Sequence, residues 1–246
     1  MIRPPLFLPS LALDSGNPCR NDAVGAGKLV HLKFSHYPHM KPFPSLPEDE
    51  IGRIDKLQAA YFTASMHLYD PPLPKGVPER LERIVASAGI RPSETVLDMG
   101  TGTGILLPII RTYSPTRIYA NDLSEAMLDS VLKSHPTVRV VKGNVRDADL
   151  KDGSIDVVFI NACYCNITDK HQAFDNIGRM MRSGGRLIIS HPLGWSFIAQ
   201  LKPSMPFPLD DFPADRREAG ELFDPYGFQV AGLVDEEKLY ILLLAK

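Results

Sequence analysis

The chain has 246 residues, a length that suits one α/β domain or one domain with an appendage. Its hydrophobic content of 44% and charged content of 23% are typical of a folded globular protein. A net charge of −2 gives no electrostatic reason to expect nucleic acid or an anionic membrane surface as a partner. No apolar run reaches the roughly 18 residues that a membrane-spanning helix requires, so we expect no membrane association.

The number and spacing of the cysteines argue against two classes of protein, those held together by disulfides and those with a structural zinc site. Cys19, Cys163 and Cys165 are odd in number, and none has a Cys-x-x-Cys spacing. This disfavours a disulfide framework and a structural zinc site, and we predict no metal. It also favours a reducing compartment, so the expected location is the cytoplasm.

Residues 1–47 differ in composition from the rest of the chain. They contain 8 of the 22 prolines and carry a net charge of +3, which leaves −5 for the other residues. Such proline density blocks helices and sheet ladders and predicts a poorly ordered N-terminal extension. An acid-poor segment with scattered arginines is also compatible with a plastid or mitochondrial transit segment, and both interpretations stay open.

Residues 48–246 predict one domain that begins with two helices. Apolar residues recur at helical spacing over 54–70, and the following Pro-Pro pair ends this helix. A second helix is predicted over 78–88. We interpret 48–90 as an N-terminal cap.

Strands and helices then alternate along the chain. The expected strands cover 94–100, 117–122, 138–143, 154–161 and 186–192, and the expected helices cover 105–113, 124–134 and 170–182. This order predicts a parallel sheet with helices on both faces. Ser183-Gly184-Gly185 is expected to end the last of these helices. Residues 229–245 predict an antiparallel hairpin around Asp235-Glu236-Glu237.

Val96–Gly104 reads VLDMGTGTG, so three glycines stand at alternate positions after an apolar strand. A glycine turn between strand and helix exposes backbone N–H groups and the positive end of the helix dipole to a ligand. A P-loop is excluded, because no Gly-Lys-Ser/Thr follows. The dinucleotide fingerprint G-x-G-x-x-G also fails, since its last glycine would fall on Ile105 or Leu107.

Two acids accompany the glycines. Asp98 stands two residues before Gly100, and Asp122 ends the next strand, 18 residues beyond Gly104. At that place a carboxylate can accept hydrogen bonds from both hydroxyls of a ribose, which favours a nucleoside ligand. The alternative is that Asp122 caps the next helix, since Asp122 and Glu125 also fit a D-x-x-E capping box.

In order, VLDMGTGTG, YANDLSEAML, KGNVRDADL, SIDVVFINACY and MMRSGGRLIIS resemble the successive motifs of class I S-adenosylmethionine-dependent methyltransferases. The similarity covers about Ala60 to Lys246. It is greatest to small members with a His-Pro-Leu-Gly segment after the fifth strand, here His191–Gly194. The resemblance implies a Rossmann-like, seven-stranded, mostly parallel sheet that closes with a C-terminal antiparallel hairpin, and S-adenosylmethionine as co-substrate.

The resemblance also implies a set of cofactor contacts. In such enzymes the glycine loop passes under the methionyl and ribose parts, the acid at the position of Asp98 orients the amino group, and the acid at Asp122 binds the ribose. Leu123 and Met127 would flank the adenine. The expected contacts in the loop itself are Gly100, Thr101, Gly102 and Gly104.

The third motif departs from the usual Gly-Asp. Here Asn144 could accept from the adenine amino group through its side-chain oxygen, or the backbone of Val145 could serve instead. Asn161 resembles the residue beneath the transferred methyl. No Asn-Pro-Pro-Tyr box follows it, which weakens methylation of adenine N6 or of a glutamine amide as the reaction.

Several residues are candidates for the acceptor side. Tyr61 and Tyr69 would cover the cofactor or belong to the core, Tyr164 is expected to line the substrate pocket, and 193–227 to form a lid or substrate insertion. His191 ends the fifth strand, and its ordinary pKa suits a general base. It could equally bond a neighbouring backbone group before Pro192.

The sequence thus predicts a methyltransferase with a small-molecule acceptor. Two alternatives remain, namely a non-catalytic S-adenosylmethionine-binding module and a nucleotide-dependent oxidoreductase.

Overall fold

The structure is a computed structural model that describes residues 43–69 and 71–246, so residues 1–42 of the predicted extension lie outside it. Within the described ranges, no helix is long and apolar enough to cross a membrane.

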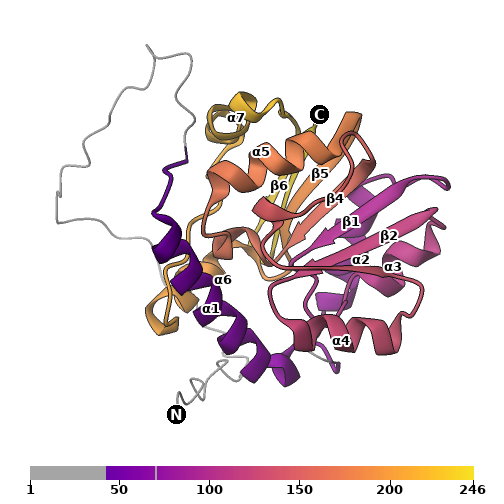
Figure 1. The fold of residues 1–246 in the computed structure, drawn as a ribbon. Coiled ribbons are helices and arrows are strands. Elements are labelled where there is room, and N and C mark those ends of the chain that lie inside the picture. Colours follow the sequence, from indigo (N-terminus) through magenta and orange to yellow (C-terminus); the bar gives the residue numbers. More distant parts are fainter. Residues whose placement is uncertain (1–42, 70) are drawn as a thin grey trace. The chain divides into compact units, whose positions relative to one another are not determined.

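The predicted sheet is confirmed (Figure 1). In the described part of the chain it has seven strands in the order β3-β2-β1-β4-β5-β7-β6. The strands are β1 (Thr95–Met99), β2 (Arg117–Asp122), β3 (Arg139–Lys142), β4 (Ile155–Asn161), β5 (Met181–His191), β6 (Gln229–Glu236) and β7 (Leu239–Ala245). The pairs from β3 to β5 are parallel, whereas β7 pairs antiparallel with both β5 and β6, as the predicted hairpin requires.

Helices cover both faces of this sheet (Figure 1). The α-helices are α1 (Glu48–Ala64), α2 (Val77–Ser87), α3 (Leu107–Thr112), α4 (Glu125–Ser134), α5 (Lys170–Met180), α6 (Gly194–Leu201) and α7 (Arg216–Phe223). Short 3-10 turns complete the list, namely η1 (Met66–Leu68), η2 (Val145–Asp147), η3 (Tyr164–Asn166), η4 (Lys202–Ser204) and η5 (Asp224–Tyr226).

The core has two parts, one on each side of the sheet. Because side chains alternate along a strand, Leu97 joins the cluster that contains α5 and α7, whereas its neighbour Val96 joins the cluster under α2 and α3. The second cluster includes Leu81 and Ile84 of α2. Thus α2, predicted as part of the N-terminal cap, instead covers a face of the sheet.

Two helices, α1 and α3, have other boundaries than the sequence predicts. Helix α1 begins at Glu48 rather than Ile54, and three acids in its first turn complement the helix dipole. It ends at Ala64, well before the Pro-Pro pair. Helix α3 begins at Leu107 rather than Ile105, because the glycine-rich turn continues and Pro108 then fits the first turn of a helix.

The prediction that Ser183-Gly184-Gly185 ends a helix was wrong. Helix α5 ends at Met180, and the three residues lie inside β5, where the pairing with β4 is shifted between Ile155 and Val157. Gly185 fits this irregular stretch, since a Cβ there would lie 2.9 Å from the carbonyl oxygen of Arg182.

Candidate functional site

The glycine loop between β1 and α3 has the backbone that the sequence predicts. Gly100, Gly102 and Gly104 have φ of +63°, +54° and +89°, values that favour glycine. A Cβ on Gly100 would lie 2.7 Å from Cys163 Cβ and closer still to its sulfur, so this glycine makes room for Cys163. A Cβ on Gly102 would meet no atom within 4 Å. Gly102 therefore presents bare backbone to open space.

Asp98 is a buried carboxylate at the end of β1. It is 2% exposed, and Thr101 Oγ1 donates to its Oδ2 at 2.7 Å. No described residue donates a hydrogen bond to Oδ1. Burial raises the pKa of Asp98 to about 7, with a further contribution from the nearby charge of Asp122, against the lowering effect of Thr101. An acid in this state fits a cationic group such as the amino group of S-adenosylmethionine.

Asp122, at the end of β2, ties two loops together. Its Oδ2 accepts from Gly102 N and its Oδ1 from Ser124 N, both at 2.9 Å. Burial raises the pKa of this carboxyl despite these bonds. The alternative role as helix cap is not adopted, because α4 begins at Glu125 and Ser124 is its N-cap, with Ser124 Oγ accepting from Met127 N.

The two residues predicted to flank an adenine lie beside this turn. Leu123 is half-buried directly after Asp122, whereas Met127 is 2% exposed in the first turn of α4. Leu123 has the more accessible side chain of the two, and both assignments stay predictions.

We expect Asp122→Asn to weaken binding of S-adenosylhomocysteine about 10- to 150-fold, which corresponds to about 1.5–3 kcal/mol for hydrogen bonds to a charged group. The variant also loses one acceptor for the N–H groups of Gly102 and Ser124, so the melting temperature without ligand should fall by several degrees. Calorimetric titration and a thermal melt measure the two effects. Unchanged affinity together with a lower melting temperature would leave Asp122 with only a structural role.

A matched control for this variant lies three residues further along. Glu125 is exposed and pairs with Lys142 on the surface. Glu125→Gln should change neither the affinity nor the melting temperature appreciably, since surface ion pairs contribute little.

The end of β4 lies against the glycine loop. Asn161 Oδ1 accepts from Ser190 Oγ of β5 at 3.0 Å, and Ala162 N donates to Ser190 O at 2.8 Å. These bonds fix the turn that places Cys163 against Gly100. Burial raises the pKa of the Cys163 thiol to about 12, so it stays protonated. The structure thus brings Asn161 and the glycine loop to one edge, with Cys163 packed between them.

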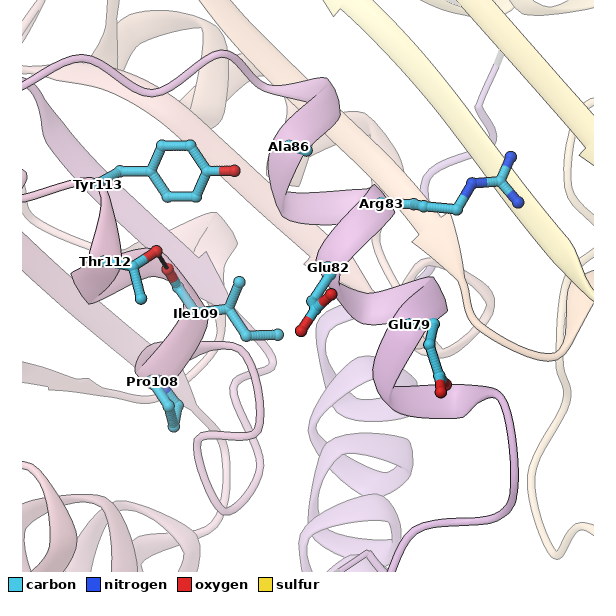
Figure 2. A pocket seen from close by; sticks show the side chains of 8 residues that line it. All are labelled: Glu79, Glu82, Arg83, Ala86, Pro108, Ile109, Thr112 and Tyr113. Carbon is cyan, nitrogen blue, oxygen red and sulfur yellow. Dashed lines mark hydrogen bonds between the residues drawn. The ribbon is translucent and has the colours of Figure 1, made fainter.

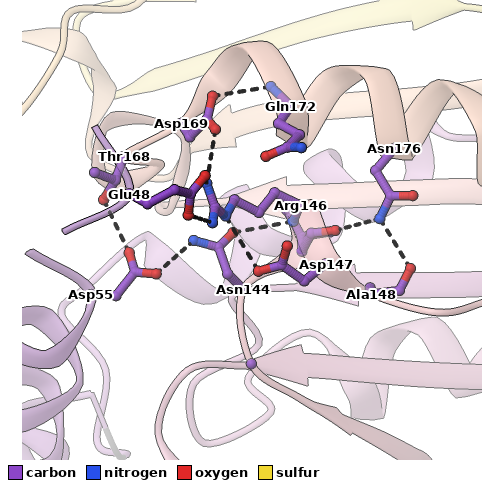
Figure 3. A network of polar contacts seen from close by, with 12 residues as sticks. Glu48, Asp55, Asn144, Arg146, Asp147, Ala148, Thr168, Asp169, Gln172 and Asn176 are labelled. Atoms are coloured by element: carbon purple, nitrogen blue, oxygen red, sulfur yellow. Dashed lines mark hydrogen bonds and ion pairs between the residues drawn. The ribbon is translucent and has the colours of Figure 1, made fainter. Parts of the chain in front are cut away.

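Helix α1 lies across the loops that follow β2, β3 and β4. Thr63 Oγ1 is 2.7 Å from Ser124 Oγ, and Gln58 Nε2 donates to Asn166 O at 2.9 Å. Asp55 accepts from Asn144 Nδ2 at 2.9 Å and from Thr168 Oγ1 at 3.3 Å (Figure 3). This position suits the predicted cap, and polar side chains of α1 hold it there.

Asn144 is engaged in this network rather than facing outward. Its Oδ1 accepts from Arg146 N and so caps η2, while its Nδ2 is bonded to Asp55 (Figure 3). An adenine contact through the side-chain oxygen would have to share that oxygen. Val145 is buried, with 4% of its surface exposed, so its side chain offers nothing to an adenine. Its backbone oxygen already accepts from Asn176 Nδ2 at 2.7 Å and from Ala148 N at 3.1 Å.

Arg146 joins the start of α1 to the start of α5. Its guanidinium pairs with Glu48 and, at 3.1 Å, with Asp169, and it also contacts Asp147 (Figure 3). Both Arg146 and Asp169 have side chains exposed by 10% or less. Sequence reasoning missed this residue, because its partners are 23 and 98 positions away along the chain.

Tyr164, predicted to line the substrate pocket, lies in the core. It is 2% exposed, its ring stacks on Phe212 with centroids 5.4 Å apart, and Lys170 Nζ lies 4.8 Å from the ring centroid. A side chain packed in this way offers no surface to a substrate, so we do not retain Tyr164 in the site.

Tyr61 and Tyr69 belong to an aromatic cluster at the end of α1. Tyr61 meets Phe62 and Phe207 edge-on, at centroid distances of 5.4 and 5.5 Å. Tyr69 lies 6.2 Å from Phe62 and is 40% exposed. Their role as a cover over the cofactor stays a prediction.

His191 ends β5 and is 5% exposed. Its Nδ1 accepts from Leu193 N at 3.1 Å, the kind of backbone bond that the sequence left open. The ring stacks on Phe197 and meets Phe212 edge-on, at 5.4 and 6.1 Å. Burial lowers the pKa of His191 to about 4, so the ring is neutral at pH 7.

A groove lies apart from these residues, between α2 and α3 (Figure 2). It has a volume of about 770 Å³ and none of the predicted cofactor residues lines it. Its walls are Glu79, Glu82, Arg83, Ala86, Pro108, Ile109, Thr112 and Tyr113. In the described ranges, no cluster of histidine, cysteine and acidic side chains suits a metal ion.

Sequence comparison relates this chain to methyltransferases. Residues 97–189 match a family described as a methyltransferase domain. The malonyl-(acyl-carrier protein) O-methyltransferase of Hahella chejuensis is 30% identical over 165 residues, which cover 64% of this chain and 58% of that protein. The chain spans between 31% and 64% of the length of the first curated relatives that it matches.

Solved structures show the same fold. A methyltransferase of Haloferax volcanii in complex with the Trm112 activator has a TM-score of 0.63 and 16% identity, over 79% of this chain and 96% of that one. The geranyl diphosphate C-methyltransferase of Streptomyces coelicolor, with Mg²⁺, geranyl diphosphate and S-adenosylhomocysteine, has a TM-score of 0.59 and 16% identity, over 82% and 98%. At such identities the likeness concerns the fold.

Proposed function

We propose that this chain is a class I S-adenosylmethionine-dependent methyltransferase, and that it transfers a methyl group from S-adenosylmethionine to a small-molecule acceptor. When bound, the co-substrate supplies an electrophilic methyl carbon on a positively charged sulfur. The observation that carries the proposal is the pairing of bare backbone at Gly102 with a buried, incompletely bonded carboxylate at Asp98.

The residues of this chain divide the work of binding. Asp98 would bind the amino group of the co-substrate, and Asp122 would accept hydrogen bonds from its ribose hydroxyls. Gly102, which has no side chain, would let the methionyl and ribose parts of the co-substrate lie close to the backbone. The remaining task of the protein is to align the acceptor with the methyl carbon and to exclude water. Asn161 and His191 stand at the ends of the two adjacent strands where that alignment would occur.

Two lines of support favour a small acceptor. The negative balance of residues 48–246 and the absence of a basic stretch in the sequence disfavour RNA and DNA. Relatives include a malonyl-(acyl-carrier protein) O-methyltransferase and a fold neighbour that methylates geranyl diphosphate. Aromatic side chains of α1, α6 and the 205–212 segment would supply an apolar surface for such a molecule.

The test is turnover with an unselected acceptor pool. The full chain is incubated with trideuteromethyl-labelled S-adenosylmethionine and a metabolite extract, and products that carry the label are sought by mass spectrometry. We expect at least one small labelled product, absent with the Gly102→Val variant. S-adenosylhomocysteine binding without any labelled product would favour the non-catalytic module, and binding of NADH without S-adenosylhomocysteine would favour the oxidoreductase.

A further inference from the structure

We propose that His191 binds the methyl acceptor through its Nε2–H as a hydrogen-bond donor, and that the acceptor group is a carboxylate on a small molecule with an apolar body. This inference rests on the proposed function and assigns the class of acceptor. It replaces the general-base role that the sequence predicts for the same histidine.

The hydrogen bond at Nδ1 decides which nitrogen carries the proton. Leu193 N donates to Nδ1 at 3.1 Å, so Nδ1 holds a lone pair. A neutral imidazole has one N–H, which therefore sits on Nε2. Burial keeps the pKa of His191 at about 4, so the ring is neutral rather than doubly protonated at pH 7. No described residue hydrogen-bonds to Nε2, and its N–H is available to a ligand.

An imidazole that carries its proton on Nε2 cannot take a proton from the methyl acceptor through that nitrogen. Its only lone pair, on Nδ1, is occupied by the first backbone N–H beyond Pro192. To act as a base, the ring would have to break that bond and reverse its tautomer inside a packed site between Phe197 and Phe212.

Other titratable groups near the ring are already committed. Tyr240, which pairs with His191 across β5 and β7, donates its hydroxyl to Pro213 O at 3.0 Å. The thiol of Cys163 has a pKa raised to about 12. The acids of the neighbouring segment form ion pairs, Asp210 with Lys170 and Asp211 with Lys202. None of these residues is therefore poised to remove a proton, and the acids at the ends of β1 and β2, Asp98 and Asp122, are assigned to the amino group and the ribose of the co-substrate.

The acceptor must then arrive without a proton to lose. A carboxylate meets this condition, because its ordinary pKa near 4 leaves it ionised at pH 7. One of its oxygens would accept from His191 Nε2–H while the other gives an electron pair to the methyl carbon. The electrons of the carbon–sulfur bond stay on sulfur, so the anion and the sulfonium become a neutral ester and a neutral thioether.

The walls of the site suit the rest of such a molecule. Phe197 stacks on the imidazole of His191 with an interplanar angle of 30°. Phe212 meets the same ring edge-on, with an interplanar angle of 66°. These rings offer apolar contact to an aromatic or aliphatic body. The same rings exclude water from the donor, which strengthens a hydrogen bond to an anion.

The tautomer is tested directly on the full chain, with nitrogen-15 in its histidines. Long-range proton–nitrogen spectra at pH 7 should show His191 protonated on Nε2, and benzoate added with S-adenosylhomocysteine should shift that N–H. His191→Leu identifies the signal by its loss. The matched control is His171→Gln, since His171 is bonded through Nδ1 to the Tyr226 hydroxyl at 3.1 Å. In this variant benzoate should still shift the N–H signal of His191. A proton on Nδ1, or an N–H unaffected by benzoate, overturns the proposal.

Turnover separates a donor from a base. Benzoate, cinnamate and octanoate are compared with their primary alcohols, with release of S-adenosylhomocysteine as the readout. With S-adenosylmethionine at a saturating concentration, so that titration of Asp98 does not limit binding, we expect the acids alone to react, at a rate that changes little between pH 6 and 8. His191→Gln keeps an amide donor and should stay within about tenfold of the parent rate, whereas His191→Leu should lose at least about 100-fold, as removal of one aligned donor does elsewhere. Reaction of the alcohols, or equal losses in both variants, contradicts the assignment.

These outcomes are distinct from failure of the proposed function. If the chain binds no S-adenosylhomocysteine and yields no labelled product from any extract, the methyltransferase activity itself is wrong. If it methylates alcohols or phenols, the activity stands and the carboxylate inference falls.

Discussion

Replacing Asp98 with asparagine is expected to raise the stability of the ligand-free protein at pH 8 while weakening its binding of S-adenosylhomocysteine. The buried carboxyl has a pKa of about 7, whereas the same group in the unfolded chain titrates near 4. Between these values the folded state binds more protons than the unfolded state, so stability falls as pH rises through this window. Above about pH 7 the loss is complete, and a neutral amide avoids it.

The gain should be on the order of 1–3 kcal/mol at pH 8, which is part of what a shift of this size corresponds to at about 1.4 kcal/mol per pH unit. For a chain of this size that raises the melting temperature by several degrees. The gain should shrink toward zero as the pH falls to about 4, and below that value both states are protonated. Thermal melts of parent and variant at pH 5, 6.5 and 8 measure the difference.

The affinity should move in the opposite direction. An amide cannot form an ion pair with the ammonium group of S-adenosylhomocysteine, so binding at pH 8 should weaken about 10- to 150-fold, or about 1.5–3 kcal/mol. Calorimetric titration measures this loss. A variant that is no more stable than the parent at pH 8, yet binds normally, would show that Asp98 is not a strained ligand-binding acid.

Asp156 provides a matched control for burial alone. It is 3% exposed, but Arg182 Nε lies 2.7 Å from its Oδ1 and Thr95 N donates to its Oδ2 at 2.8 Å. Asp156→Asn breaks an existing ion pair and should lower the melting temperature at pH 8, without affecting the affinity. If the melting temperature at pH 8 rises in Asp98→Asn and falls in Asp156→Asn, the stabilisation comes from the incomplete bonding of Asp98 and not from burial alone.

Local patterns were enough to predict most of the fold. Alternating strands and helices gave the parallel sheet, and two apolar runs around a polar break gave the hairpin, because both depend on periodicity over a few residues. The turn itself was misplaced, since Asp235 and Glu236 pair within β6 and the chain turns at Glu237 and Lys238. The pattern was less reliable where a local preference competes with pairing. Gly184 and Gly185 read as a helix stop, but the register of β5 against β4 draws them into a strand.

The site was predictable for residues that act through backbone geometry and not for those that act through distant partners. Gly100 and Gly102 could be found because strand–glycine–helix is a local pattern. Arg146 and Asp55 could not, since they join segments about 90 to 110 positions apart. The same limit explains Tyr164, whose place in the core depends on Phe212, 48 residues further on.

The glycine loop offers the largest expected effects on binding, and its glycines should respond differently. Gly102→Val adds a side chain where the structure has open space, so the stability cost should be limited to the strain of a positive φ, about 1–2 kcal/mol. Binding of S-adenosylhomocysteine should weaken by at least about 100-fold, since the side chain would fill the space assigned to the ligand. Titration and a chemical unfolding curve separate the two.

In Gly100→Ala, by contrast, the loss of stability should be larger than the loss of affinity. Its Cβ would press on Cys163, which adds an overpacking cost of about 1–3 kcal/mol to the strain at φ +63°. Because Cys163→Ala removes the sulfur but keeps the Cβ that would lie 2.7 Å from the new methyl group, the double variant should regain only part of that loss, about 1 kcal/mol. A Gly102→Val protein that binds normally would mean that Gly102 does not face the ligand. A double variant no more stable than Gly100→Ala would mean that Cys163 does not limit the space at Gly100.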